Sequence, residues 1–304
     1  MNGVLIIDKP AGLTSHDVVN RVRRILKQRS VGHLGTLDPL ATGVLPLVVG
    51  NLTRLAQFYT SSEKTYEGVI RFGFATDTYD AEGEPTSVTQ DVKVSLEQLR
   101  ALAGEFCGKI EQMPPPFSAK KIHGVPAYKL ARKQKEVTLK AVQVEIKEFE
   151  ITSAEGNCAQ FRARVASGTY MRSVAHDMGQ KLGCGAHLQS LRRTALGEFS
   201  LGDAHTLEEI ATQAAEGRVE EMFVHPRKLL PEFPAVTVTD ADAARIRSGR
   251  TVNLPELSRA RQVKVFYGQS QLIAVATRVA GTLFHPRIVL AADAAPQTAP
   301  SHIH

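Results

Sequence analysis

The apolar and polar residues at the start of the chain predict a strand followed by a helix. The segment GVLIIDK (3–9) is typical of a short buried strand, and a Pro/Gly turn follows it. Thr14 or Ser15 can cap a helix whose apolar positions between Val18 and Leu26 recur at helical spacing. The opposite face of this helix is basic, which suits either a solvated surface or contact with phosphates. Its cations are Arg21, Arg23, Arg24, Lys27 and Arg29.

The middle of the chain predicts a half-buried strand and an antiparallel hairpin. Apolar and polar positions alternate from Tyr66 to Phe74, as on a strand with one buried face. Alternation returns between Val142 and Ile151 with a slip of one residue, which predicts a β-bulge. A third alternating segment, 161–165, follows the turn SAEGN, so we expect the last two segments to pair as a hairpin.

Helix signals follow the hairpin. Apolar residues recur at helical spacing from Met171 to Leu182, and Gly183 stands where helices commonly end. Thr206 and Glu209 have the spacing of a capping box, which predicts the start of another helix.

Prolines and a change of pattern around HPRKLLPEFPAV (225–236) predict a domain boundary near residue 231. Beyond it come short strand-like segments separated by turns, which are typical of a small β-barrel or sandwich. These segments are AVTVT (235–239), TVNL (251–254), QVKVFY (262–267), QLIAVATRV (271–279) and TLFHPRIVL (282–290). We therefore expect a first domain over 1–230, a β-rich domain over 231–292 and a disordered Ala/Pro-rich tail over 293–304.

The composition is that of an ordinary globular protein with a slight excess of positive charge. Hydrophobic residues make up 43% and charged residues 22%, and no apolar run reaches the roughly 18 residues of a membrane span. The N-terminus lacks the pattern of a signal peptide, and three scattered cysteines have no metal-ligand spacing. The net charge of +6 permits an anionic partner such as nucleic acid. We expect a cytoplasmic protein with no membrane association and no metal.

A single carboxylate stands in an otherwise apolar, glycine-rich stretch, VGHLGTLDPLATGVLPLVVG (31–50). Asp38 precedes Pro39, which favours an extended backbone at Asp38. The residues alone leave two interpretations. Asp38 caps a helix or turn that begins at Pro39, or it is kept as a nucleophile or general base, because an unpaired carboxylate among apolar residues is costly.

Arg172 and Tyr66 are further candidates, each with an ordinary structural alternative. Arg172 lies at the start of a predicted helix, where the helix dipole disfavours a cation, so it requires an anionic partner unless it is a plain surface residue. Tyr66 shares the apolar face of its strand, which also suits a core tyrosine.

The segment PPPFSAKKIHGVPAYKLARKQKEVTLK (114–140) is strongly basic. It contains seven Lys and Arg residues against one Glu, and its rings are Phe117, His123 and Tyr128. Cations that meet phosphates and rings that stack on bases suit a nucleic-acid surface, with a solvated loop as the alternative.

Five motifs occur in an order that resembles the TruB-type tRNA pseudouridine synthases. They are DKPAGLTSHDVV (8–19), GHLGTLDPLATGVL (32–45), KTYEGVIRFG (64–73), PPPFSAKKIHG (114–124) and SGTYMRSVAHDMGQKLGCGAHLQSLRR (167–193). The resemblance is close over residues 3–205. It is looser beyond, where VTVTDADAARIRSGRTVNL (236–254) resembles the start of a PUA-like RNA-binding module. The family implies an α+β catalytic fold with a mixed, mostly antiparallel sheet, followed by a small β-rich domain.

The resemblance also implies the chemistry. Asp38 matches the catalytic carboxylate in the isomerisation of uridine to pseudouridine, which requires no cofactor. As the nucleophile it attacks the base or the sugar; the other route is that it first removes a sugar proton. Arg172 is implied to pair with Asp38 and keep it ionised. Tyr66 is implied to stack on the target uracil and to assist the proton that leaves C5.

Three further positions match the family's substrate pocket. Tyr170 and Leu191 match residues that line it. His33 is implied to fill the space that the target nucleotide vacates when it turns out of its stack.

The implied substrate is the uridine at position 55 in the T-loop of tRNA. We expect a monomer without an obligate protein partner, because the sequence has no coiled coil and no obvious sticky face. The basic segment 114–140 and the basic helix face are implied to hold the RNA backbone. The individual residues expected to do so are Lys64, Lys120, Lys121 and Arg132.

The chain departs from the family pattern at two named positions, and it also lacks an arginine that is commonly found before a VxVxxI-like strand. Leu34 stands where relatives commonly have a small or hydroxyl residue, and Gln134 stands where glycine is common. Two other functions are compatible with the motifs. Dyskerin-type relatives share them and work in guide-RNA complexes, although such chains commonly carry longer extensions. The other is an RNA-binding or tRNA-folding protein with secondary catalysis, against which the complete set of Asp38, Tyr66 and Arg172 argues.

Overall fold

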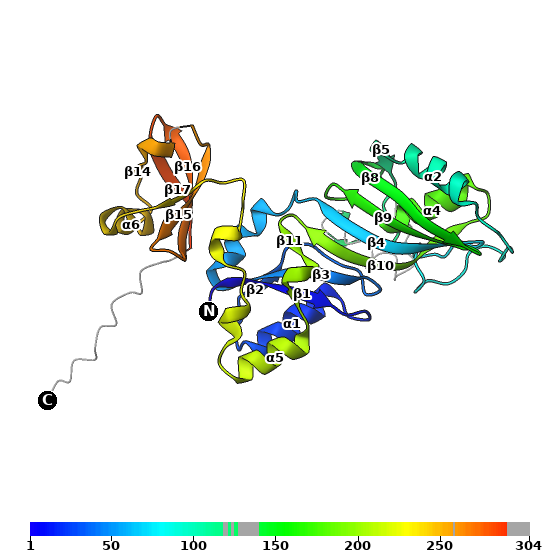
Figure 1. Cartoon of the computed structure of the whole chain (residues 1–304), viewed down its shortest axis with the longest axis horizontal. Coiled ribbons are helices and arrows are strands. Elements are labelled where there is room, and N and C mark those ends of the chain that lie inside the picture. Colours follow the sequence, from blue (N-terminus) through cyan, green and yellow to red (C-terminus); the bar gives the residue numbers. More distant parts are fainter. Residues whose placement is uncertain (118–120, 123–124, 127–139, 258, 291–304) are drawn as a thin grey trace.

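The computed structural model describes residues 1–117, 121–122, 125–126, 140–257 and 259–290. Within them, one long sheet runs through most of the molecule, and the C-terminal strands form a second sheet at one end (Figure 1). A short separate ribbon consists of β6 (Lys121–Ile122) and β7 (Val125–Pro126).

The long sheet has the order β12-β1-β3-β10-β4-β9-β8-β5, with β2 paired to β3 and β11 paired to β10. Its strands are β1 (Gly3–Lys9), β2 (Val31–His33), β3 (Thr42–Val49), β4 (Lys64–Phe72), β5 (Gly108–Gln112), β8 (Val142–Glu155), β9 (Cys158–Val165), β10 (Ala186–Leu196), β11 (Phe199–Ser200) and β12 (Ala204–His205). In the described part of the chain, the pairs β1–β12 and β3–β10 are parallel and the other pairs of this sheet are antiparallel. The predicted mixed, mostly antiparallel sheet is confirmed.

Helices cover both halves of the long sheet. The α-helices of this part are α1 (Ser15–Ile25), α2 (Leu96–Glu105), α4 (Met171–Lys181) and α5 (Leu207–Ala215). The first and last of these lie beside β1, whereas α2 and α4 lie on the half that contains β8, β9 and β4 (Figure 1). Their apolar faces and those of the sheet form one buried core. The short 3-10 helices are η1 (Gly50–Phe58), η2 (Leu201–Asp203), η3 (Val219–Met222) and η4 (Pro226–Lys228).

Local sequence signals place several of these elements. Thr14 caps α1 through a reciprocal pair of hydrogen bonds with Asp17: the Asp17 amide donates to Thr14 Oγ1 over 3.1 Å, and the Thr14 amide donates to Asp17 Oδ2 over 2.9 Å. The register of β8 shifts between Ile146 and Glu148, which confirms the predicted bulge. Gly183 has φ +71 directly after the end of α4, as expected for a glycine at that position.

The second sheet has the order β13-β15-β16-β17-β14. Its strands are β13 (Ala235–Thr237), β14 (Val252–Asn253), β15 (Gln262–Tyr267), β16 (Gln271–Ala280) and β17 (Leu283–Val289), and α6 (Asp240–Arg247) and η5 (Pro255–Leu257) lie between them. All five predicted strands are present, and this region is β-rich. The boundary at residue 231 and the PUA-like character stay predictions, and the tail 293–304 lies outside the described residues.

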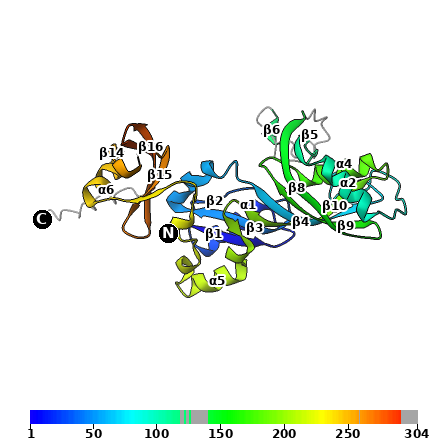
Figure 2. The same ribbon diagram turned by 45° about the horizontal axis from the view of Figure 1, so that its top comes forward.

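The C-terminal sheet lies at the end of the molecule that holds β1 and β2 (Figure 2). Polar contacts join it to the rest of the chain. The buried Lys264 donates from Nζ to the Leu229 carbonyl over 2.7 Å, in the segment that leads into this sheet. Asn51 of η1 donates to the Leu290 carbonyl over 2.8 Å. Among the helices of the described residues, none has the length and apolar character that crossing a membrane requires.

Candidate active site

Asp38 lies in the loop that joins β2 to β3. The Ala41 amide donates to the Asp38 carbonyl over 3.1 Å, which closes a turn over residues 38–41, and no helix begins at Pro39. The structural interpretation of Asp38 allows a helix or a turn at Pro39: the helix is wrong, and the turn is present. The carboxylate of Asp38 is left for another partner.

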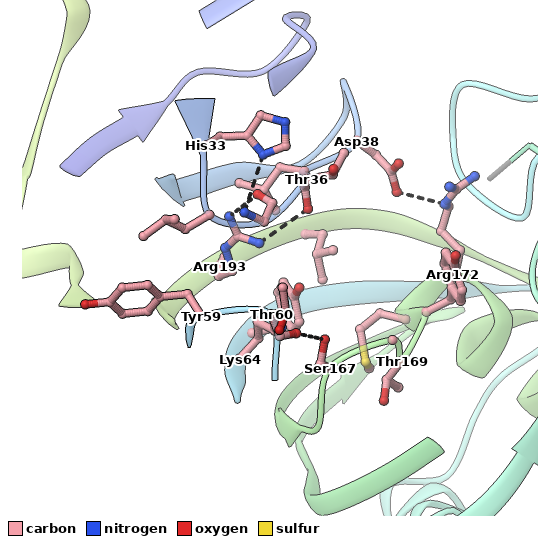
Figure 3. Close-up of a pocket in the computed structure, with 18 of the residues that line it drawn as sticks. His33, Thr36, Asp38, Tyr59, Thr60, Lys64, Ser167, Thr169, Arg172 and Arg193 are labelled. Carbon is pink, nitrogen blue, oxygen red and sulfur yellow. Dashed lines mark hydrogen bonds and ion pairs between the residues drawn. The ribbon is translucent and has the colours of Figure 1, made fainter. Parts of the chain in front are cut away.

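That partner is Arg172, the second residue of α4. Its Nε lies 2.9 Å from Asp38 Oδ2 (Figure 3). The oxygen lies off the direction of the N–H, so the contact is an ion pair and not an aligned hydrogen bond. The Arg172 side chain is 6% exposed and that of Asp38 39% exposed. A buried cation thus faces a carboxylate that stays accessible.

The remaining guanidinium nitrogens of Arg172 contact two other segments. Nη1 donates to the Thr78 carbonyl over 3.1 Å and lies 3.5 Å from Asp80 Oδ2, and Nη2 donates to the Phe117 carbonyl over 3.0 Å. Asp80 is a buried second carboxylate that sequence reasoning missed. It stands among several acidic residues of a turn-rich loop, TDTYDAEGEPTS (76–87), and nothing in that pattern distinguishes it.

The ion pair borders two adjoining cavities. The first has a volume of about 480 Å³, within the roughly 300–1,000 Å³ typical of small-molecule sites. Six predicted site residues other than Arg172 line it: His33, Asp38, Lys64, Tyr66, Tyr170 and Leu191. The second, of about 670 Å³, shares His33, Asp38 and Arg172 and extends towards Asp80 and Glu82. The structure thus brings together residues from β2, the 34–41 loop, β4, α4 and β10.

Three buried side chains hold the loop that carries Asp38, and the sequence did not point to them. Ser15 Oγ accepts from the Leu37 amide over 2.8 Å and donates to the Leu37 carbonyl over 3.1 Å. Lys9 Nζ donates to the carbonyls of Pro39 (3.2 Å) and Ala41 (2.7 Å). Each of these side chains satisfies main-chain atoms that lie within four residues of Asp38.

Arg193, the third of these side chains, is fully buried on β10. It donates from Nη2 to the Gly35 carbonyl (3.0 Å), from Nη1 to the Thr36 carbonyl (3.3 Å) and from Nε to the Val44 carbonyl (2.7 Å) (Figure 3). The parallel pairing of β10 with β3 brings the Arg193 backbone so close to Gly43 that a Cβ there would lie 2.2 Å from the Arg193 carbonyl oxygen. Gly43 also has φ +96, so both its space and its conformation require glycine.

Burial and like charges shift the pKa values of the cavity's other cations. Burial, together with Arg193, lowers the pKa of Lys64 to about 8. Burial first, then Arg193 and His16, lowers the pKa of His33, which favours its neutral ring. On the side of the second cavity, burial and the nearby Asp80 and Asp38 raise the pKa of Glu82.

Part of the predicted RNA-contacting surface lies outside the described residues. This applies to Lys120 and Arg132, to His123 and Tyr128, and to the side chain of Lys121. On α1 and just beyond it, Arg21, Arg24, Lys27 and Arg29 are exposed. Arg23 instead donates to the Val31 carbonyl over 2.8 Å, so it serves at least in part to hold the fold.

Comparison with known proteins decides which family this arrangement belongs to. The tRNA pseudouridine synthase B of Solibacter usitatus is 52% identical over 95% of this chain and 100% of its own length. The chain belongs to the TruB family of pseudouridylate synthases. The TruB N-terminal domain model matches residues 23–171, and the model of the tRNA pseudouridylate synthase B C-terminal domain matches residues 172–231. A second TruB relative, tRNA pseudouridine synthase B of Aquifex aeolicus, is 39% identical over 95% of this chain and all of its own length.

Solved structures show the same TruB-type fold. A chain in the crystal structure of a Cbf5–Nop10–Gar1 complex superposes with a TM-score of 0.71 at 25% identity, over 95% of this chain and 85% of that one. A chain of an H/ACA RNP bound to a substrate RNA containing 2′-deoxyuridine has the same TM-score at 24% identity, which supports the fold alone. The expected pseudouridine-synthase fold of this TruB-family chain is confirmed.

Proposed function

We propose that this protein isomerises uridine to pseudouridine at position 55 in the T-loop of tRNA, with Asp38 as the nucleophile. The bond between uracil N1 and ribose C1′ breaks, a bond between C5 and C1′ forms, and N1 gains a proton while C5 loses one. Atoms and electrons therefore balance within the nucleotide. The observation that carries the proposal is the Asp38–Arg172 ion pair, whose carboxylate opens into a cavity of nucleoside size.

The side chains around the carboxylate suit this reaction. Arg172 places a positive charge beside the Asp38 carboxylate, and a nucleotide seated in the cavity displaces water that would hydrolyse an intermediate. Tyr66 lies on β4 beside the cavity with 8% of its surface exposed, so its ring can stack on uracil and its hydroxyl can assist at C5. Leu191 and Tyr170 complete the walls, which hold the detached base while it turns.

A base reaches this cavity after it leaves its own stack. Asp38 lies in a recess between β2, β4 and α4, where a stacked nucleotide cannot bring its glycosidic bond to the carboxylate. Extrusion costs a few kcal/mol, about the price of unstacking one nucleotide, and a loop with splayed bases keeps that cost small. His33 lines both cavities next to Asp38, a position from which its neutral ring can fill the vacated space in the RNA.

The backbone of the flipped nucleotide requires cations, and Lys64 supplies one at the cavity. Its Nζ donates to the Ser62 carbonyl over 2.6 Å and forms no ion pair with a carboxylate in the described part of the chain, so its charge is available to a phosphate. Lys120, Lys121 and Arg132 are proposed to extend this contact along the RNA. Affinity for tRNA is then expected to fall steeply with salt, because each neutralised phosphate releases counterions.

A single assay tests the proposal. The purified chain alone, without guide RNA or a partner protein, is incubated with a tRNA transcript carrying tritium at C5 of uridine, and the release of tritium is followed. Wild-type protein is expected to release the label of one uridine per tRNA, and a transcript with cytidine at position 55 is expected to release none.

The variant Asp38→Asn keeps the shape of the side chain but removes the charge. Its turnover is expected to fall more than about 10³-fold, with tRNA affinity within a few-fold of wild type. Label release by Asp38→Asn at the wild-type rate would show that the carboxylate is not the nucleophile. A requirement for added guide RNA would favour a guide-dependent enzyme instead, the alternative that the structural similarity to the Cbf5 chain raises.

A further inference from the structure

We propose that Tyr79 and His176 are positioning residues whose stacked rings hold the loop of residues 76–84 against Arg172, and through it fix Arg172 relative to Asp38. The inference rests on the proposed function, because it concerns the same carboxylate. Neither residue lines the two cavities at Asp38, so neither is expected to touch the nucleotide.

The loop of residues 76–84 contacts Arg172 at Nη1, whereas Asp38 lies against Nε. Thr78 offers its carbonyl and Asp80 its carboxylate to the same nitrogen, Nη1. Asp80 is itself fixed, because its Oδ1 accepts from Thr78 Oγ1 over 2.6 Å and from the Glu82 amide over 3.1 Å. The orientation of the guanidinium towards Asp38 therefore depends on where this loop lies.

Tyr79, between the two contacting residues, has an unfavourable backbone. Its φ is +65, a conformation that non-glycine residues rarely adopt because the Cβ crowds the neighbouring carbonyl. Main-chain hydrogen bonds fix it there: its amide donates to the Thr76 carbonyl over 3.3 Å, and its carbonyl accepts from the Leu188 amide over 3.0 Å. A strained residue persists where its surroundings stabilise it, and a contact of the Tyr79 side chain adds to these main-chain bonds.

His176 provides that contact. It follows Arg172 by four residues, so α4 presents both side chains on one face. The rings of Tyr79 and His176 are stacked, with centroids 3.8 Å apart and planes 13° from parallel. Among the described residues, the buried Nδ1 of His176 has no hydrogen-bond partner. Packing against Tyr79 is thus the contact this imidazole makes, and burial lowers its pKa in favour of the neutral ring.

The replacements at Tyr79 separate the ring from the backbone strain. Tyr79→Phe keeps the stacked ring and removes only the hydroxyl, which makes no hydrogen bond in the described part of the chain. The kcat of Tyr79→Phe is therefore expected within about twofold of wild type. Tyr79→Asn tolerates positive φ but lacks the ring. Its kcat is expected to fall about tenfold or more with KM within about twofold, because the guanidinium of Arg172 is displaced relative to Asp38 while the RNA contacts remain.

The replacements at His176 test the other ring. The kcat of His176→Ala is expected to fall as much as that of Tyr79→Asn. His176→Phe keeps a flat ring against Tyr79, so most of the wild-type kcat is expected to return. The double variant Tyr79→Asn/His176→Ala is expected to lose no more kcat than either single variant, because both remove the same contact. An unchanged kcat in Tyr79→Asn, or additive losses in the double variant, would overturn the inference.

Failure of this inference can be distinguished from failure of the proposed function. Wild-type protein and Asp38→Asn are measured in the same assay, and a wild type without turnover overturns the proposed function alone. Urea unfolding then tests the pair without turnover: the losses of stability in Tyr79→Asn and Arg172→Met are expected to be non-additive, because both act on the same loop. Additive losses would show that the stack does not act on Arg172.

Discussion

Replacement of Arg193 by methionine tests how the Asp38 loop is held. Methionine keeps much of the side-chain volume but removes the charge and every donor. Three carbonyls, those of Gly35, Thr36 and Val44, would lose their hydrogen bonds inside the protein. In the described part of the chain, no carboxylate forms an ion pair with Arg193, so the guanidinium is stabilised by these carbonyls.

The size of the effect follows from these contacts. A hydrogen bond from a charged donor contributes about 1.5–3 kcal/mol, so three bonds contribute roughly 5–9 kcal/mol. Removing a buried charge that has no counter-ion also removes its desolvation penalty, which stabilises the variant by several kcal/mol, on the order of half that sum. The expected net loss of stability in Arg193→Met is therefore about 2–4 kcal/mol. The loop of residues 33–38 is also released, and a shift of about 1 Å in the carboxylate is expected to lower kcat roughly 100-fold.

Urea unfolding followed by circular dichroism measures the stability change, and tritium release from tRNA measures kcat. Arg192→Met is the matched control, because the neighbouring Arg192 on β10 pairs with Asp8 over 2.7 Å near the surface. That pair is expected to contribute less than about 1 kcal/mol. If Arg193→Met loses no more stability than Arg192→Met and turns over at the wild-type rate, Arg193 does not hold the loop.

Three further changes give distinct outcomes. Gly43→Ala is expected to lower the free energy of unfolding in urea by about 3 kcal/mol or more, because its Cβ would meet the Arg193 carbonyl and the φ of residue 43 is +96. A loss under about 1 kcal/mol would contradict the packing described. Ser15→Ala leaves both polar atoms of Leu37 unpaired and is expected to lose about 1–3 kcal/mol, with Ser15→Thr as the variant that keeps the hydroxyl. Since the pKa of Lys64 is lowered to about 8, the free enzyme loses this positive charge as the pH rises from 7 to 9, and tRNA affinity is expected to weaken over that interval. Lys64→Arg stays charged, so its filter-binding Kd should vary less with pH; equal pH dependence in both proteins would show that Lys64 does not contact a phosphate.

The elements that local signals determine could be predicted from the sequence. The capped start of α1, the bulge in β8 and all five C-terminal strands depend on residues close together along the chain. The Asp-Pro pair at Asp38 is compatible with either a helix start or a turn, and the structure has the turn. The family resemblance, and not periodicity, paired Asp38 with Arg172.

The supporting residues could not be predicted because their partners are distant along the chain. Lys9 and Arg193 look like ordinary basic residues in the sequence, and their burial follows from the placement of β1 and β10 beside β3. Asp80 is a partner of Arg172 because α4 packs on β10 and β4. The two residues are about ninety positions apart in the sequence. Tyr79 had no local signal for its positive φ, which main-chain contacts with β10 impose.

The contacts that hold the Asp38 loop fall on its main chain. Ser15, Lys9 and Arg193 bind amides and carbonyls between residues 35 and 44, and none of these bonds depends on which side chain the loop residue carries. An exposed position such as Thr36, which lines both cavities, can accordingly mutate during evolution without displacing Asp38. Proteins that inherit this loop can therefore change the RNA that they accept while the position of Asp38 stays the same.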